Sequence, residues 1–190
     1  MTRATVLGFL TILTLVLMVL FQSSPSSQQY AMLEVEGESI VFSPYTVWRE
    51  GFPLFPKERI TDPVNVIFLN TTIEDIETIL YENGWMPIVA SSQFLYIGHA
   101  RVKNGSQLIH PGKNEKQRYH VRLFSYKNLV FGAVHLEAGH ALISWEEAEY
   151  FLARTFTDVK QHKGKAITKV AFRNTENDGH ATFINLASTK

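Results

Sequence analysis

The sequence contains no cysteine, and this absence excludes several classes of protein at once. Disulfide-stapled scaffolds, thiolate zinc sites and cysteine nucleophiles all need a sulfhydryl group. A surplus of positive charge is also missing, because 18 lysine and arginine residues balance 18 aspartate and glutamate residues. Nucleic-acid-binding domains usually carry a basic surplus. We therefore expect no nucleic acid among the partners.

The sequence also lacks the familiar catalytic signatures. It has no Gly-x-Ser-x-Gly elbow, no phosphate-binding glycine loop and no dinucleotide fingerprint. Its composition, with 45% apolar and 19% charged residues, is that of a folded globular chain. A length of 190 residues suits one ordinary domain. Any functional site must therefore be sought in the pattern of polar residues on the predicted elements.

A near-continuous apolar run covers residues 5–21. A helix of that length extends about 25 Å, which is at the short end for crossing a bilayer. The sequence therefore predicts a signal anchor, which is a transmembrane helix, or a signal peptide over residues 1–21. A flexible polar linker over 22–29 and a domain over 30–190 follow. Arg3 is the charge that precedes the run, so the domain is expected outside the cytoplasm, or secreted after cleavage.

Apolar runs predict the strands of the domain, and two capping boxes predict its helices. Thr71 with Glu74 begins one helix and Ser144 with Glu147 begins the other. Strands are expected at 63–69, which reads as central, and at 94–102, 167–172 and 181–186, with a loop at 107–116. The predicted fold class is α+β, with a single mixed or antiparallel sheet, two helices packed on one face and the N-terminal apolar helix in front.

The longest predicted unit is a hairpin over residues 117–137. Successive side chains of a strand point to opposite faces, so Arg118, His120 and Arg122 share one face. Aliphatic residues alternate with them and are expected to point inward.

The turn of this hairpin fixes which residues face each other. With Lys127-Asn128 as the loop, His120 is expected opposite His135, and Arg118 opposite Glu137. The polar residues of both strands therefore belong to one side of the sheet.

The first interpretation of this polar face is an anion site. Arg118, His120 and Arg122, with Lys113 and Lys116 in the preceding loop, have the charge to bind a phosphate or carboxylate. A membrane-tethered domain would meet an anionic envelope or lipid-related ligand there. The simpler alternative is a solvated sheet face on which Arg118 pairs with a carboxylate.

The second interpretation is a metal site. His120, His135, His140 and Glu137 have ligand-type side chains for zinc or another divalent metal ion. Cross-strand neighbours lie about 5 Å apart, close enough for two histidines to share one ion. A metal ion with an open coordination position would make the protein a metal-dependent hydrolase.

The third interpretation is a structural or interaction domain without chemistry of its own. An exposed edge strand or the aromatic residues between Trp48 and Phe55 would then contact a membrane protein partner. The simpler alternative is that these aromatic residues belong to the core.

The order of several short motifs resembles the LssY-like C-terminal domain, over roughly residues 60–187. The matching points are Asp62-Pro63-Val64-Asn65-Val66, Gly84-Trp85, Arg118-Tyr119-His120-Val121-Arg122-Leu123, Val130-Phe131-Gly132-Ala133, His140, Asp178-Gly179 and Phe183-Ile184-Asn185-Leu186. The resemblance implies association with membrane proteins, sometimes beside a phosphatidic-acid-phosphatase-type module. It implies no known activity.

Overall fold

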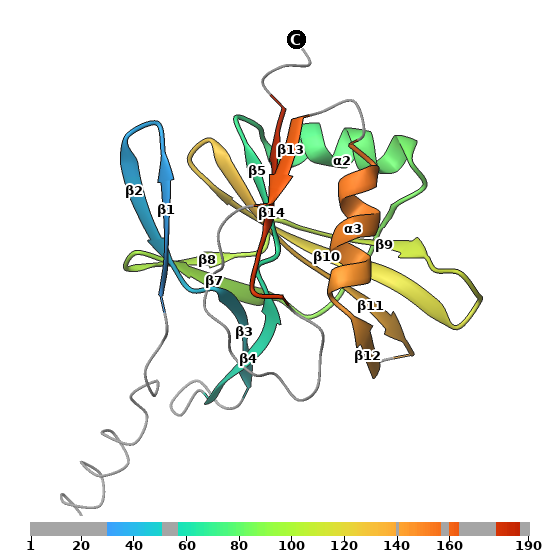
Figure 1. Ribbon diagram of the computed structural model, residues 1–190. Coiled ribbons are helices and arrows are strands. Elements are labelled where there is room, and N and C mark those ends of the chain that lie inside the picture. Colours follow the sequence, from blue (N-terminus) through green and yellow to red (C-terminus); the bar gives the residue numbers. More distant parts are fainter. Residues whose placement is uncertain (1–29, 51–56, 140, 157–159, 164–177, 187–190) are drawn as a thin grey trace, which may run out of the picture.

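The computed structural model of the protein describes residues 30–50, 57–139, 141–156, 160–163 and 178–186. Within these residues the chain is mostly β, with two sheets that curl into a half-barrel and two short helices. Figure 1 shows the smaller sheet on the left and both helices beside the larger sheet on the right. The larger sheet therefore has a neighbour on each of its faces.

The smaller sheet has the strand order β1-β2-β7-β3-β4, with β8 paired to β7. Its strands are β1 (Ala31–Val35), β2 (Glu38–Phe42), β3 (Tyr45–Glu50), β4 (Lys57–Pro63), β7 (Gln93–Ile97) and β8 (Ala100–Lys103). Residues 94–102, expected as one strand, instead form β7 and β8, which are separated by a turn where Gly98 has a φ of +56°. Glycine suits that turn because it adopts a positive φ without steric cost.

The larger sheet has the order β13-β14-β5-β11-β10-β9-β6, with β12 paired to β11. Its strands are β5 (Val66–Leu69), β6 (Met86–Pro87), β9 (Ser106–Pro111), β10 (Gln117–Tyr126), β11 (Leu129–Ala138), β12 (Ala141–Ser144), β13 (Lys160–Lys163) and β14 (Thr182–Asn185). The expected central strand is confirmed as β5, which pairs with β11 and, in parallel, with β14. The prediction of a loop at 107–116 is wrong in its first half, where the chain forms β9. The strand expected at 167–172 lies outside the described residues.

Both predicted helices are present, and each begins close to its expected cap. Helix α2 (Ile73–Glu82) is capped by Thr72, whose side chain accepts from Asp75 in a reciprocal capping box one residue later than expected. Helix α3 (Glu146–Arg154) follows Ser144, whose Oγ accepts a hydrogen bond from Glu147 N at 3.1 Å.

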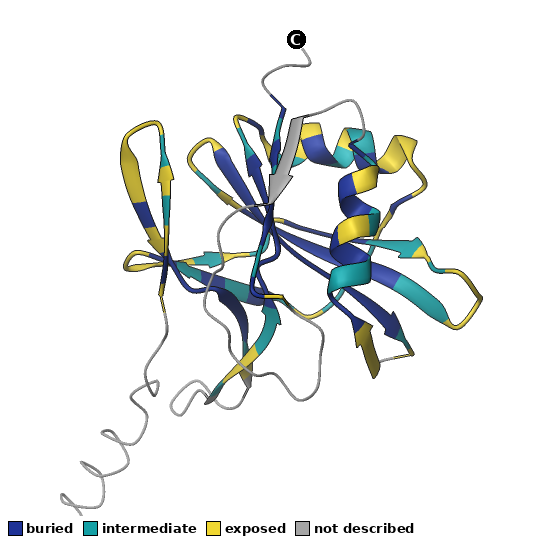
Figure 2. Ribbon diagram, in the orientation of Figure 1, coloured by how far each residue is buried: buried dark blue, intermediate teal, exposed yellow. Residues whose placement is uncertain are grey.

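Two apolar clusters lie on opposite faces of the β10–β11 hairpin. The cluster beneath the helices includes Val121, Leu123, Val134, Leu136, Ile76, Leu80 and Leu152. The cluster that joins the two sheets includes Phe124, Phe131, Ala133, Phe42, Leu95 and Ile97. The hairpin is therefore buried along most of its length, as Figure 2 shows.

The predicted α+β fold class is wrong, because the described residues are mostly β, with two sheets and only two short helices. The sequence suggested one sheet with two helices on one face, and the structure has two sheets. The second sheet, to which residues 31–50 contribute β1, β2 and β3, covers the second face of the hairpin. The polar residues of the hairpin consequently face protein rather than solvent.

No helix among the described residues is long and apolar enough to cross a bilayer. The transmembrane helix, or signal anchor, expected over residues 1–21 lies outside the described residues, as does most of the aromatic stretch after Trp48. The expected transmembrane helix therefore has no counterpart among the described residues. The function proposed below does not depend on it.

Candidate functional site

Strands β10 and β11 pair in the register that the sequence predicts. The turn lies at Lys127-Asn128, His120 faces His135, and Arg118 faces Glu137. The two imidazole rings approach edge to face, with their centroids 5.1 Å apart. The prediction that these polar side chains gather on one face of the hairpin is confirmed.

A carboxylate from the smaller sheet completes this cluster. Asp62 lies near the end of β4, where the chain leaves the smaller sheet and continues into β5 of the larger one. The ladder between β5 and β11 ends at Gly132, whose carbonyl accepts from Asn65 N at 3.1 Å. The Asn65 side chain then bonds the Val134 main chain twice, donating to its carbonyl at 2.9 Å and accepting from its amide at 3.0 Å. These bonds fix the bend that holds Asp62 beside His135.

Opposite charges alternate through the cluster. Arg122 Nη1 donates to Asp62 Oδ2 at 2.8 Å, and Asp62 Oδ1 lies 3.1 Å from His135 Nδ1. On the other side of the ring, His135 Nε2 lies 3.4 Å from Glu137 Oε2, while Glu137 Oε1 accepts from Arg118 Nε at 2.5 Å. His135 therefore lies between two carboxylates, and an arginine holds each carboxylate from its far side.

Pairing outweighs the cost of burial in this group. Burial lowers the pKa of His135, but the larger opposite effect of Asp62 and Glu137 raises this pKa to about 9. Burial raises the pKa of Asp62, yet His135 and Arg122 hold it well below its usual range. Burial also raises the pKa of Glu137, but His135 and Arg118 outweigh this effect and lower the pKa to about 2. At neutral pH His135 is thus an imidazolium between two carboxylates.

His120 behaves differently from His135. Its side chain is buried, with 5% exposed, and its Nε2 has no hydrogen-bond partner among the described residues. Burial, together with Arg122 and His135, lowers the pKa of His120 to about 3, so the ring is neutral. A buried polar atom without a partner costs roughly 1–3 kcal/mol. The unpaired nitrogen of His120 is therefore available to a ligand.

The cluster contains a set of atoms that fits a metal ion. His120, His135 and Glu137 each offer one ligand atom, and these atoms all lie within 4.8 Å of one another. Ligands about 2.0–2.1 Å from a tetrahedral zinc ion are about 3.3 Å apart, so small side-chain rotations would bring them together. Two histidines and one glutamate are a known ligand set of zinc hydrolases. Asp62 at Nδ1 of His135 is the type of outer carboxylate that orients a metal-bound imidazole.

The other predicted site residues have mixed positions. Arg118 and Arg122, expected to offer free charge to an anion, are each paired with a carboxylate. Arg122 is buried rather than solvated. His140 lies outside the described residues.

Asp62 is the residue that analysis of the hairpin did not find. Its signals in the sequence were its place in the Asp62-Pro63-Val64-Asn65-Val66 motif and its position immediately before Pro63 and a buried strand.

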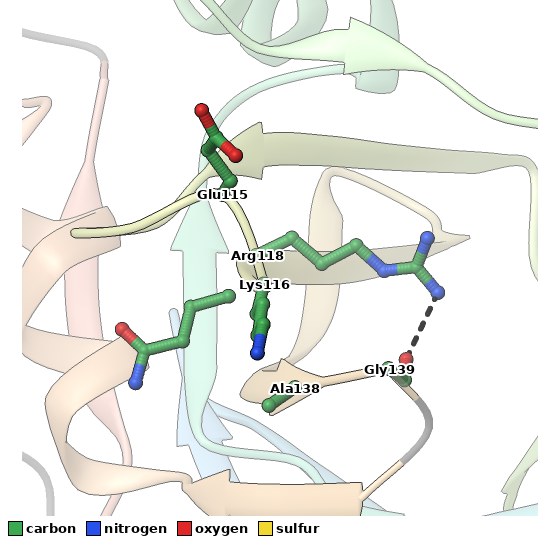
Figure 3. Close-up of a pocket in the computed structure, with 6 residues that line it drawn as sticks. Glu115, Lys116, Arg118, Ala138 and Gly139 are labelled. Carbon is green, nitrogen blue, oxygen red and sulfur yellow. Dashed lines mark hydrogen bonds between the residues drawn. The ribbon is translucent and has the colours of Figure 1, made fainter.

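An open pocket lies at the end of the hairpin nearest Glu137. It is lined by Glu115, Lys116, Gln117, Arg118, Ala138 and Gly139, and Figure 3 shows these residues. Arg118 belongs to both the pocket wall and the buried cluster, because it bonds Glu137 through Nε and the Gly139 carbonyl through Nη2.

No family model matches the chain, and searches of curated proteins and of solved structures found no match. The resemblance to the LssY-like C-terminal domain therefore stays a prediction.

Proposed function

We propose that this protein binds one divalent metal ion, zinc in the first instance, through His120 Nε2, His135 Nε2 and the Glu137 carboxylate. The observation that carries this proposal is the meeting of three buried side chains, each with a ligand atom within 4.8 Å of the others. One of the three, His120, also has a buried ring nitrogen without a hydrogen-bond partner among the described residues. A surface cluster of the same residue types would carry less weight, because exposed charged groups rarely need an explanation. In this cluster a metal ion would satisfy a nitrogen that is otherwise buried without a partner.

Asp62 supports the metal without binding it directly. The ion would take the position of the proton on His135 Nε2, and Nδ1 of the ring would stay 3.1 Å from Asp62 Oδ1. Arg122 holds the second oxygen of Asp62, so the orientation of the ring is set from the smaller sheet. Outer carboxylates of this kind typically change metal affinity about 10–100-fold.

Metal-dependent hydrolysis is the second candidate function. A specific feature favours it, because three ligands are the number found in catalytic zinc sites, where water occupies the fourth position. The pocket beside Glu137 would give a substrate its approach.

The experiment is a metal titration of the purified full-length protein with cobalt and zinc. We expect one equivalent to bind and the cobalt form to show the absorption spectrum of a tetrahedral site. His120→Ala should weaken binding by more than about 100-fold, because loss of an outer partner alone costs about 10–100-fold. His99→Ala is the matched control, since His99 lies exposed in the turn between β7 and β8. Absence of stoichiometric metal, or equal affinities of the two variants, would contradict the proposal.

A further inference from the structure

The pocket beside the candidate metal centre has firmly positioned rims. Its two sides are joined by a main-chain hydrogen bond from Gly139 N to the Lys116 carbonyl at 3.3 Å. The Lys116 amide in turn donates to Asn114 Oδ1 at 3.1 Å, and Gly112 N donates to the Gln117 carbonyl at 2.8 Å. A β-carbon at Gly112 would lie 2.6 Å from Gln117 Cβ, so the turn is tightly closed. The hollow, about 480 Å³ in volume, is therefore formed in advance of any ligand.

Arg118 connects this hollow to the buried cluster. Its side chain is 36% exposed, while that of Glu137 is only 10% exposed. Because Arg118 bonds Glu137 and also lines the pocket, a ligand in the pocket would contact the same guanidinium group that covers the candidate metal ligand. Binding of a metal ion and binding of a ligand in the pocket would thus be linked through one side chain.

The charges that line the pocket favour an anion. Lys116 and Arg118 are cationic, and Glu115 is the single acidic residue of the lining. In Figure 3 the carboxylate of Glu115 and the amine of Lys116 point in opposite directions, so the acid does not neutralise the lysine. Arginine is suited to oxyanions because its planar fork donates two parallel hydrogen bonds.

Charge balance shows when this anion would bind. In the cluster, the opposite charges cancel within the Arg118–Glu137 pair and within the Arg122–Asp62 pair. A divalent ion that displaces one proton from His135 would add one net positive charge in a buried region, where charges interact more strongly than in water. Coordination by Glu137 would also weaken its hold on Arg118.

From this geometry we infer that the pocket is an oxyanion site that works together with the metal. It binds a phosphate or carboxylate group through Lys116 and Arg118. This inference rests on the proposed function, since the metal supplies the charge that draws the anion. By thermodynamic linkage, the anion must then strengthen metal binding by the same factor.

The test is calorimetric titration of inorganic phosphate into the full-length protein, with and without one equivalent of zinc, at constant ionic strength. We expect binding to the zinc form to be at least about tenfold tighter than to the metal-free form. Lys116→Ala should weaken phosphate binding to the zinc form about tenfold, the typical loss for one charged hydrogen bond. Lys113→Ala is the control, because Lys113 lies in the same turn, pairs with Glu147 at 2.6 Å and does not line the pocket.

Titration of phenyl phosphate under the same conditions distinguishes the source of the anion. Tight binding of both compounds indicates a site for phosphate esters, and binding of phosphate alone indicates a site for the free ion. If zinc binds but phosphate binds equally well without it, or if Lys116→Ala behaves like Lys113→Ala, the pocket assignment is overturned and the metal centre stands. If zinc does not bind, the metal centre and the pocket assignment fall together.

Discussion

The two faces of the β10–β11 hairpin are both buried, but they are built from different chemistry. The buried part of the face beneath the helices is apolar, with Val121, Leu123, Val134 and Leu136 in one cluster. The other face changes along its length. Near the turn, Phe124 and Phe131 pack against the smaller sheet, and toward the open end His120, Arg122, His135 and Glu137 replace them.

This difference indicates where the fold gains stability and where it places function. Burying apolar surface contributes about 25 cal/mol per Å², whereas a buried ion pair is often no better than apolar residues of the same volume. A charged cluster in that position therefore needs a reason other than stability. The helix-facing side should respond to loss of volume, and the polar side to loss of charge or metal.

The largest effect is expected from removing the carboxylate that joins the two sheets. Asp62→Ala leaves Arg122 buried without its partner, and breaking a buried pair costs roughly 3–5 kcal/mol. Urea unfolding of the metal-free protein measures this loss. Glu38→Ala is the control, because Glu38 pairs with Lys127 on the surface, where such pairs contribute about 0–1 kcal/mol. Similar losses in both variants would mean that the polar face is effectively solvated.

A slightly smaller effect is expected on the helix-facing side. Leu123→Ala removes a fully buried side chain and should destabilise the protein by about 3 kcal/mol. The loss should be the same with and without zinc, and the zinc affinity of the folded variant should not change. If Leu123→Ala instead lowered metal affinity as strongly as His120→Ala, the separation between the two faces would be incorrect.

The pH dependence of metal affinity should report the protonation state of a single histidine. The pKa of His135 is about 9 and that of His120 about 3, so between pH 5.5 and 8.5 the metal displaces a proton from His135 alone. Apparent affinity should therefore fall about tenfold for each pH unit lost. Cobalt titrations across this range give the slope. Release of two protons would show that His120 is also charged in the metal-free protein.

The smallest effect on stability is expected at His120. His120→Leu replaces an unpartnered buried ring with an apolar side chain, so at pH 7.5 the change should stay within about 1 kcal/mol. In the unfolded chain the pKa of His120 is about 6.5. Below that pH only the unfolded wild-type chain protonates this residue, so the stability of the wild type should decrease as the pH is lowered. Thermal unfolding from pH 7.5 to 5 should show a shallower fall for the variant, which should also fail to bind metal. A loss of several kcal/mol would assign His120 a structural role.

Much of the hairpin could be predicted because its rules are local. Alternation placed His120, Arg122 and His135 on one side, and the two-residue loop at Lys127-Asn128 set the register. Capping boxes gave both helices to within a residue or two, because a cap depends on a few neighbouring positions.

The rest depended on contacts that sequence spacing does not specify. Arg122 and Asp62 are 60 positions apart, and their meeting requires that β4 belong to one sheet and β5 to the other. Alternation of Arg118, His120 and Arg122 with aliphatic residues looks the same whether solvent or a second sheet covers the polar row. The pattern gave the faces of the hairpin correctly and left open what lies against them.

The side chain of Asn65 also gives the molecule a built-in reporter. The amide hydrogen of Val134 is held by a side-chain oxygen beyond the last rung of the β5–β11 ladder. Its exchange with deuterated solvent therefore follows the opening of one seam rather than the melting of a strand. That single resonance would register whether the crossing between the sheets tightens when an ion occupies the histidines, independently of any assay of activity.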